Sequence, residues 1–310
     1  MENTRAKTTR NSLILLLTAT IWGMAFVSQS KGMDYMHPFT FNGVRSLIGA
    51  AGILVYILIS RKIAGDKAAK LDWKLNVRAG LLCGIFLTIA STLQQFGIKY
   101  TSVGKAGFIT TLYIIFVPMF GIFLKKKVAP VVWAAASMAA VGMYLLCMTE
   151  SLRLGAGDIM VFLCAIAFAI QIMTVDHYAA RIDGAVVSCI QFTVCGVVCC
   201  IGALIWGQPT FGQLQEGLGA LLYAGVLSCG VGYTLQIVGQ KGLNPTVAAL
   251  IMSLESVIAT ISGWIAYKIG FLSTDQTLTP RQIAGCVIVF AAVILVQLPP
   301  EWFRFGKKNA

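Results

Sequence analysis

The sequence predicts an all-α membrane protein of about ten transmembrane helices, arranged as two inverted five-helix repeats around a central cavity. Composition is the first observation behind this fold class. Of the 310 residues, 57% are hydrophobic and only 12% are charged, and the mean hydropathy is +0.80, values outside the range of soluble domains. Second, the apolar residues form separate runs of about 20 residues, the length that a helix needs to cross a hydrocarbon core of about 30 Å. Third, the fourth helix of each half carries the same pattern, with small and polar residues on one face and bulky apolar residues on the other.

Five apolar runs fill the first half of the chain, residues 1–148, which is the first predicted repeat. Arg5, Lys7 and Arg10 precede the first run and make the N-terminus look like a signal peptide. The run lacks a convincing small-residue cleavage site, so we predict that it is retained as the first spanning helix. The predicted helices cover residues 11–29, 37–60, 75–96, 102–124 and 128–148.

The second half, residues 149–310, holds five more runs and is the second predicted repeat. Because five is an odd number, the second repeat enters the membrane from the side opposite to the first, and the repeats are inverted. The predicted helices cover residues 157–178, 183–206, 217–239, 243–267 and 281–298.

The fourth and ninth predicted helices carry the clearest sign of duplication. In both, small and polar residues share one face and bulky apolar residues fill the other. Lipid favours the bulky side, so the small and polar faces should line the interior of the protein. The aligned identical residues are Ala106 with Ala248, Ile109 with Ile251, and Leu112 with Leu254.

Lys and Arg residues are distributed unequally between the two predicted sides. Of the 24, 17 lie on one side and six on the other, and Arg45 lies inside a predicted helix. Because basic residues near helix ends stay cytoplasmic, we predict a multi-pass protein of the cell (plasma or inner) membrane with both termini in the cytoplasm. The net charge of +12 then reflects orientation and not nucleic-acid binding, which would need a basic patch among base-reading residues.

The sequence predicts no cofactor, no metal site and no catalytic residues. All nine cysteines lie in apolar stretches without the spacing of metal ligands. We find no HExxH, GxSxG or P-loop motif and no paired carboxylates, so we predict that the protein is not an enzyme and does not itself use ATP.

Short motifs follow one another in a fixed order along most of the chain. They are residues 21–27 (IWGMAFV), Arg45, and residues 93–102 (LQQFGIKYTS), 108–113 (FITTLY), 116–118 (FVP), 248–257 (AALIMSLESV) and 278–282 (LTPRQ). With these motifs the chain resembles the EamA-like branch of the drug/metabolite transporter (DMT) superfamily. The resemblance implies an exporter or importer of metabolites, with the first four helices of each half around a central cavity and the fifth and tenth at the periphery.

Glu255 and Arg45 are the charged residues predicted to lie deepest in the membrane. Glu255 lies about halfway along its helix, on the small-residue face, where a carboxylate costs about 2.5 to 3.5 kcal/mol. It would bind a cationic substrate group or a coupling proton, or else act as a protonated structural hydrogen-bond partner. Arg45 lies roughly 10 Å deep. It would attract an anionic substrate group or pair with Glu255 as a gate, or else snorkel to the nearer interface.

Amide and hydroxyl side chains extend the predicted substrate site. An amide can both donate and accept hydrogen bonds and so can orient a polar ligand. Among the intramembrane glutamines we predict that Gln95 and Gln191 line the pathway and that the others join helices. Ser253 shares the small-residue face with Glu255.

Three aromatic residues and one proline complete the candidate residues. Trp22, Tyr113 and Tyr233 could stack on a ligand, although aromatic residues in spanning helices are more often packing residues or interface anchors. Pro118 removes one backbone hydrogen bond from its helix and is the predicted hinge.

These features predict a secondary transporter, one not driven by ATP, that moves a small metabolite, an amino acid or a drug by alternating access, as an exporter. Its partners would be a small-molecule substrate, membrane lipid and a coupling proton. The alternative is an ion or solute channel, or a flippase of a lipid-linked intermediate. A channel would pass ions without saturation, whereas alternating access saturates and shows counterflow.

Overall fold

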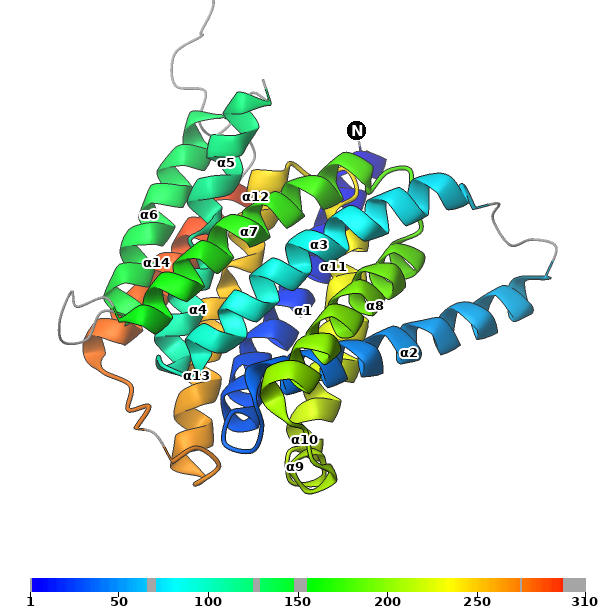
Figure 1. The fold of residues 1–310 in the computed structure, drawn as a ribbon. Coiled ribbons are helices and arrows are strands. Elements are labelled where there is room, and N and C mark those ends of the chain that lie inside the picture. Colours follow the sequence, from blue (N-terminus) through cyan, green and yellow to red (C-terminus); the bar gives the residue numbers. More distant parts are fainter. Residues whose placement is uncertain (1, 66–70, 125–128, 148–154, 274, 298–310) are drawn as a thin grey trace, which may run out of the picture.

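The computed structural model describes residues 2–65, 71–124, 129–147, 155–273 and 275–297, and these residues form a bundle of helices without a strand (Figure 1). The first half contains α1 (Glu2–Gly32), α2 (Pro38–Ala64), α3 (Trp73–Ile98), α4 (Val103–Thr111), α5 (Tyr113–Phe123) and α6 (Pro130–Cys147). The second half begins with α7 (Ala156–Tyr178), α8 (Gly184–Gly202), the π-helical turn η2 (Ala203–Gly207) and α9 (Phe211–Glu216). It continues with α10 (Leu218–Leu222), the π-helical segment η3 (Tyr223–Gly232), α11 (Tyr233–Gln240), α12 (Pro245–Met252), α13 (Leu254–Lys268) and α14 (Pro280–Gln297).

Eight helical segments of the described chain are long and apolar enough to cross a membrane. Two shorter apolar helices, Pro130–Gly142 in α6 and Pro280–Leu295 in α14, occupy the positions of the fifth and tenth predicted helices. The protein is therefore an all-helical, multi-pass membrane protein with eight candidate spans in its described residues. The total of ten spans stays a prediction.

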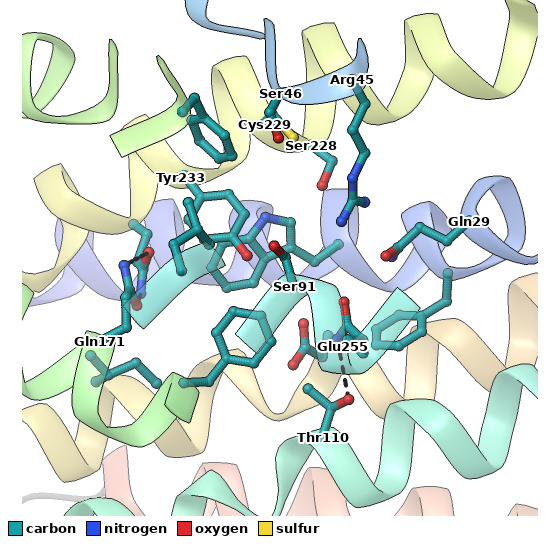
Figure 2. Close-up of a pocket in the computed structure, with 18 of the residues that line it drawn as sticks. Gln29, Arg45, Ser46, Ser91, Thr110, Gln171, Ser228, Cys229, Tyr233 and Glu255 are labelled. Atoms are coloured by element: carbon teal, nitrogen blue, oxygen red, sulfur yellow. Dashed lines mark hydrogen bonds between the residues drawn. The ribbon is translucent and has the colours of Figure 1, made fainter. Parts of the chain in front are cut away.

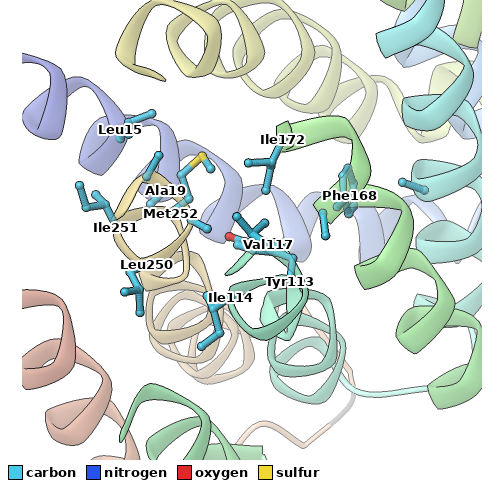
Figure 3. Packing of buried hydrophobic residues seen from close by; sticks show 14 of the residues in the cluster. Leu15, Ala19, Tyr113, Ile114, Val117, Phe168, Ile172, Leu250, Ile251 and Met252 are labelled. Atoms are coloured by element: carbon cyan, nitrogen blue, oxygen red, sulfur yellow. The ribbon is translucent and has the colours of Figure 1, made fainter. Parts of the chain in front are cut away.

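Helices from the two halves interleave. α2 packs against α8, α3 runs along α7, and α1 contacts both α11 and α13 (Figure 1). α6 and α14 pack against each other at one side of the bundle. Buried side chains of α1, α5, α7 and α12 meet in the largest apolar cluster, where Leu15, Ile114, Phe168 and Ile251 lie (Figure 3).

Polar side chains fix several helix starts. The carboxylates of Asp72 and Asp183 accept backbone N–H groups at the starts of α3 and α8. At the start of α2, the Nδ1 atom of His37 accepts the N–H of Phe39 at 3.3 Å. Burial, reinforced by the positive charge of Lys99, lowers the pKa of His37, which favours the neutral imidazole that this cap needs.

Two predicted helices are interrupted at related places. The predicted helix 102–124 is divided at Leu112 into α4 and α5, and the predicted helix 243–267 is divided at Ser253 into α12 and α13. Before the first break, the hydroxyl of Thr111 donates to the carbonyl of Phe108 at 2.8 Å. At the second, the hydroxyl of Ser253 donates to the carbonyl of Leu250 at 2.7 Å. Such bonds compete with the helical ladder and bend helices.

Pro118, the predicted hinge, lies inside α5 and not at the break. The missing N–H of a proline affects the carbonyl four residues earlier, here that of Ile114, whereas the hydrogen-bond pattern changes at Leu112, which keeps helical backbone angles. The matching break between α12 and α13 has no proline. Pro118 therefore coincides with neither break, and its hinge role stays a prediction.

Asp158 ties the start of α7 to α4 through a buried cluster. Its Oδ2 accepts the Lys105 ammonium at 2.5 Å and the N–H of Gly155 at 2.9 Å, and its Oδ1 accepts the Thr101 hydroxyl at 2.9 Å. Asp158 is 4% exposed, so its carboxylate depends on these donors. The cluster fixes the α3–α4 connection against the second half of the chain.

The substitution Asp158→Asn should lower the melting temperature of the purified protein. Hydrogen bonds to a charged group contribute about 1.5 to 3 kcal/mol, and the substitution leaves the Lys105 ammonium without its partner. The matched control is Asp34→Asn, because Asp34 pairs with Lys31 but its side chain is 55% exposed, and exposed pairs contribute little. Equal melting temperatures for the two variants would contradict the stabilising role of Asp158.

Candidate functional site

A cavity lies at the centre of the bundle, where helices of both halves meet (Figure 2). The space between its lining atoms amounts to about 570 Å³, counting the part open to solvent, but only about 30 Å³ can hold the centres of water molecules. A single water needs roughly 10 to 15 Å³ by this measure, so the lining side chains leave room for a few waters. A substrate must therefore displace side chains or enter when the helices move apart.

Glu255 reaches this cavity from the first turn of α13 (Figure 2). It is 4% exposed, and its Oε1 accepts the hydroxyl of Tyr113 at 3.0 Å. Glu255 follows Ser253, at which the hydrogen-bond pattern between α12 and α13 changes.

Arg45 enters the cavity from α2 and points toward the region of Glu255 (Figure 2). It is 5% exposed, its guanidinium carbon lies 5.4 Å from the centre of the Phe41 ring, and its Nε has no hydrogen-bond partner among the described residues. The structure describes no ion pair between Arg45 and Glu255. A guanidinium turned inward in this way does not snorkel along the lipid face.

Close backbone contacts set the positions of both charged residues. A Cβ atom at Gly23 of α1 would lie 2.7 Å from the carbonyl oxygen of Glu255. A Cβ atom at Gly225 of η3 would lie 2.9 Å from the carbonyl oxygen of Arg45. Only glycine allows these approaches, and π-helical segments such as η3 occur often at functional sites.

The substitution Gly225→Ala is expected to reduce transport at least tenfold and to lower the melting temperature. The added Cβ would lie 2.8 Å from the Cβ of Ile48, so α2 must shift and carry Arg45 with it. Gly219→Ala is the matched control, because a Cβ at Gly219 meets no atom within 4 Å. Transport by proteoliposomes and thermal melting check this, and normal transport by Gly225→Ala would show that the close approach does not position Arg45.

Aromatic rings form one wall of the cavity. The ring centres of Trp22 and Tyr233 are 4.5 Å apart, and Phe192 meets Tyr233 edge-on at 5.0 Å. The indole N–H of Trp22 has no partner among the described residues, although it is buried. The wall therefore offers a large apolar surface together with a free hydrogen-bond donor.

The glutamines that line the cavity are Gln29, Gln94, Gln171 and Gln236, whereas Gln95 and Gln191 were predicted to line the pathway. Gln94 donates to the Thr110 hydroxyl at 3.2 Å, and Gln171 and Gln236 bond each other, with Gln236 donating to Gln171 at 3.1 Å. These three glutamines line the cavity, and the prediction had assigned them to joining helices. Gln94, Gln171 and Gln236 therefore both line the cavity and join neighbouring helices.

Gln95 and Gln191 lie outside the cavity lining. Gln95 is fully buried and donates to the carbonyl of Gln29 at 3.1 Å. Gln191 is fully buried on α8, and neither of its amide atoms has a partner among the described residues. Ser253 also stays outside the lining, because its hydroxyl is used at the helix break.

The structure therefore brings together five of the eight predicted binding residues, namely Trp22, Arg45, Tyr113, Tyr233 and Glu255. Sequence reasoning did not assign fourteen other residues to the lining. They are Phe26, Gln29, Ser46, Leu87, Ser91, Gln94, Thr110, Phe168, Gln171, Ile172, Phe192, Ser228, Cys229 and Gln236.

Part of this set recurs at a constant spacing. Tyr113 and Glu255, which share a hydrogen bond, are 142 residues apart. The same separation of 142 relates other lining residues of α3 to those of η3 and α11. These pairs are Leu87 with Cys229, Ser91 with Tyr233, and Gln94 with Gln236. Extending the sequence alignment of the fourth and ninth helices back to the third and eighth would have found them.

Comparisons with known proteins agree with this architecture. The model of the EamA-like transporter family matches residues 10–148 and, separately, residues 155–298. An uncharacterized transporter of Archaeoglobus fulgidus is 27% identical over 290 residues, covering 92% of this chain and 84% of the relative. The uncharacterized transporter YwfM of Bacillus subtilis is 24% identical over 294 residues, covering 94% of each chain.

A solved structure described only as "Crystal structure of protein" has the same fold, with a TM-score of 0.73 at 16% sequence identity, and the match covers 96% of this chain and 99% of the other. The family predicted from the sequence motifs is thereby confirmed. Because the family model matches both halves and most of the length, this chain belongs to the EamA-like transporter family and is a membrane transporter.

Proposed function

We propose that the protein is a secondary transporter that carries a small zwitterionic molecule, such as an amino acid, through the central cavity by alternating access. The observation that carries the proposal is the placement of Arg45 and Glu255, a basic and an acidic residue that are both buried and face one cavity without forming an ion pair. A buried charge without a counter-charge costs several kcal/mol. A substrate with one carboxylate and one ammonium group would neutralise both.

The remaining lining suits the rest of such a molecule. The aromatic wall of Trp22, Tyr233 and Phe192 would contact an apolar side chain, while Ser91 and Gln94 could bond polar groups. The restricted space for water favours a substrate held tightly in a dry site over an open pore. For this reason we prefer transport by alternating access to the channel alternative.

Alternating access is supported by the internal repetition. Inverted repeats allow the two halves to exchange conformations about a site near the middle of the membrane. The lining residues separated by 142 positions, and the matched breaks at Leu112 and Ser253, fit such an exchange. Two residues at equivalent positions of the repeats can touch each other only near the axis that relates the halves. Tyr113 and Glu255 are such a pair and share a hydrogen bond, so in this proposal they lie close to that axis.

Ligand-induced stabilisation of the purified protein tests the proposal. A ligand at one hundred times its Kd stabilises the folded state by about 2.7 kcal/mol. Zwitterionic amino acids with apolar side chains should raise the melting temperature, whereas the matching amines and the matching carboxylic acids should not. A positive ligand would then show saturable counterflow in proteoliposomes. Stabilisation by the amine or the acid alone would contradict the zwitterion assignment, and transport without saturation would indicate a channel.

A further inference from the structure

A second cavity, more open than the central one, lies where α2 ends, α8 begins and α11 ends, and about 320 Å³ of it can hold the centres of water molecules. Arg61 and Lys241 supply two positive charges to it, and Tyr56, Ser60 and Thr234 supply hydroxyl groups. In contrast to the central cavity, it has room for several waters or for a small headgroup. Nothing in the transport proposal uses this site.

The helix α11 separates the two cavities. Thr234 and Val238 lie on the same face of α11, four residues apart, and line the second cavity. Tyr233 and Gln236 lie on another face of the same helix and line the central cavity. The second cavity is therefore a separate site at the end of the bundle, and its ligand need not be the transported substrate.

The charges of the second cavity favour an anion. Asp183 is the one acidic residue in the lining, and its Oδ1 accepts the N–H groups of Ala185 and Val186 at 2.9 and 3.1 Å. One oxygen of this carboxylate is thus used at the start of α8, and with Arg61 and Lys241 the lining keeps a formal charge of +1. Lys241 uses one of its three hydrogens for the carbonyl of Ile182 at 3.3 Å, which fixes its ammonium at the cavity and leaves two donors.

The surroundings favour a lipid as the source of the anion. The α2 segment beside the cavity carries large apolar side chains on the outside of the bundle, with Tyr56 61%, Ile59 54% and Ile63 82% exposed. In a spanning helix such side chains face acyl chains. A cationic cavity next to a lipid-facing surface at a helix end is typical of headgroup sites.

We propose that the second cavity binds the phosphate of an anionic phospholipid, through Arg61 and Lys241, with the acyl chains lying along the outer face of α2. Arg offers a planar pair of donors for phosphate, and the Lys ammonium adds a point charge. The hydroxyl of Tyr56 lies within the same lining and can donate to a headgroup oxygen, whereas the hydroxyls of Ser60 and Thr234 already donate to the carbonyls of Ile57 and Gly230.

The test measures phosphatidylglycerol that stays bound after purification from vesicles of phosphatidylcholine and phosphatidylglycerol in equal amounts, by native mass spectrometry. The double variant Arg61→Gln, Lys241→Gln should retain at least tenfold less phosphatidylglycerol than the wild type. The control is Lys62→Gln, Arg181→Gln, which removes the same charge from exposed residues outside the cavity lining. The control should retain wild-type amounts.

A second variant, Ser60→Phe, fills the cavity without changing its charge and should also lose the lipid, which keeps the test valid if the double variant does not fold. Equal retention by the variants and the control would overturn the proposal. Displacement of the lipid by millimolar glycerol phosphate, which has no acyl chains, would overturn the lipid assignment and indicate a soluble phosphate ligand. Neither outcome depends on the identity of the transported substrate.

Discussion

Transport by the Glu255→Gln variant is expected to fall at least tenfold. Glutamine has nearly the same shape as glutamate, and its carbonyl oxygen can still accept the Tyr113 hydroxyl, so the fold should persist. The variant loses the negative charge that would meet the ammonium group of the substrate. A charge-assisted hydrogen bond contributes about 1.5 to 3 kcal/mol, and each 1.4 kcal/mol is a factor of ten in affinity.

The measurements are the ligand-dependent melting temperature and the initial rate of counterflow across a range of pH. Glu216→Gln is the matched control, because it makes the same chemical change at an exposed residue at the end of α9. If Glu255 also carries a coupling proton, the pH dependence of the remaining transport should flatten. Full transport by Glu255→Gln, with the wild-type pH profile, would exclude both substrate binding and proton coupling by this residue.

The membrane fold could be predicted from the sequence because the bilayer imposes a minimum length on each apolar run. The eight candidate spans coincide closely with predicted runs, for example Leu218–Gln240 with 217–239. The helix breaks at Leu112 and Ser253 could not be predicted. At each break a hydroxyl group bonds a carbonyl three residues earlier, but Ser256 and Ser262 make the same bond inside α13 without a break, so such residues do not locate a break in the sequence.

The candidate site was predictable where the charge of a residue limited the directions in which its side chain could point. A carboxylate at the depth of Glu255 is too costly to face lipid, whereas Arg45 could also have snorkelled to the nearer interface; the structure buries both side chains. Adjacent glutamines were a harder case. Gln94 and Gln95 point about 100° apart on α3, and both are buried, but only the rotation of α3 against its neighbours decides which one faces the cavity. Composition and periodicity carry little information about that rotation.

The Arg45→Gln variant should lose affinity for a zwitterionic substrate by at least thirtyfold, because the guanidinium is the only cation in the described cavity lining that could bind the carboxylate. Arg45→Lys should restore part of the affinity, since an ammonium keeps the charge but not the paired donors. The control Arg78→Gln removes an exposed arginine at the start of α3 and should bind normally.

Substrate analogues separate recognition by Arg45 from a structural role. For the amide of the substrate, which lacks the carboxylate, the wild type and Arg45→Gln should bind with similar affinity, because the interaction that Arg45 provides is absent from both complexes. For the deaminated acid, the same equality should hold between the wild type and Glu255→Gln. If Arg45→Gln weakened binding of the amide as strongly as that of the zwitterion, the guanidinium would act by holding α2 in place and not by contacting the carboxylate. The pair of analogues thus assigns each buried charge to one end of the substrate independently of the other.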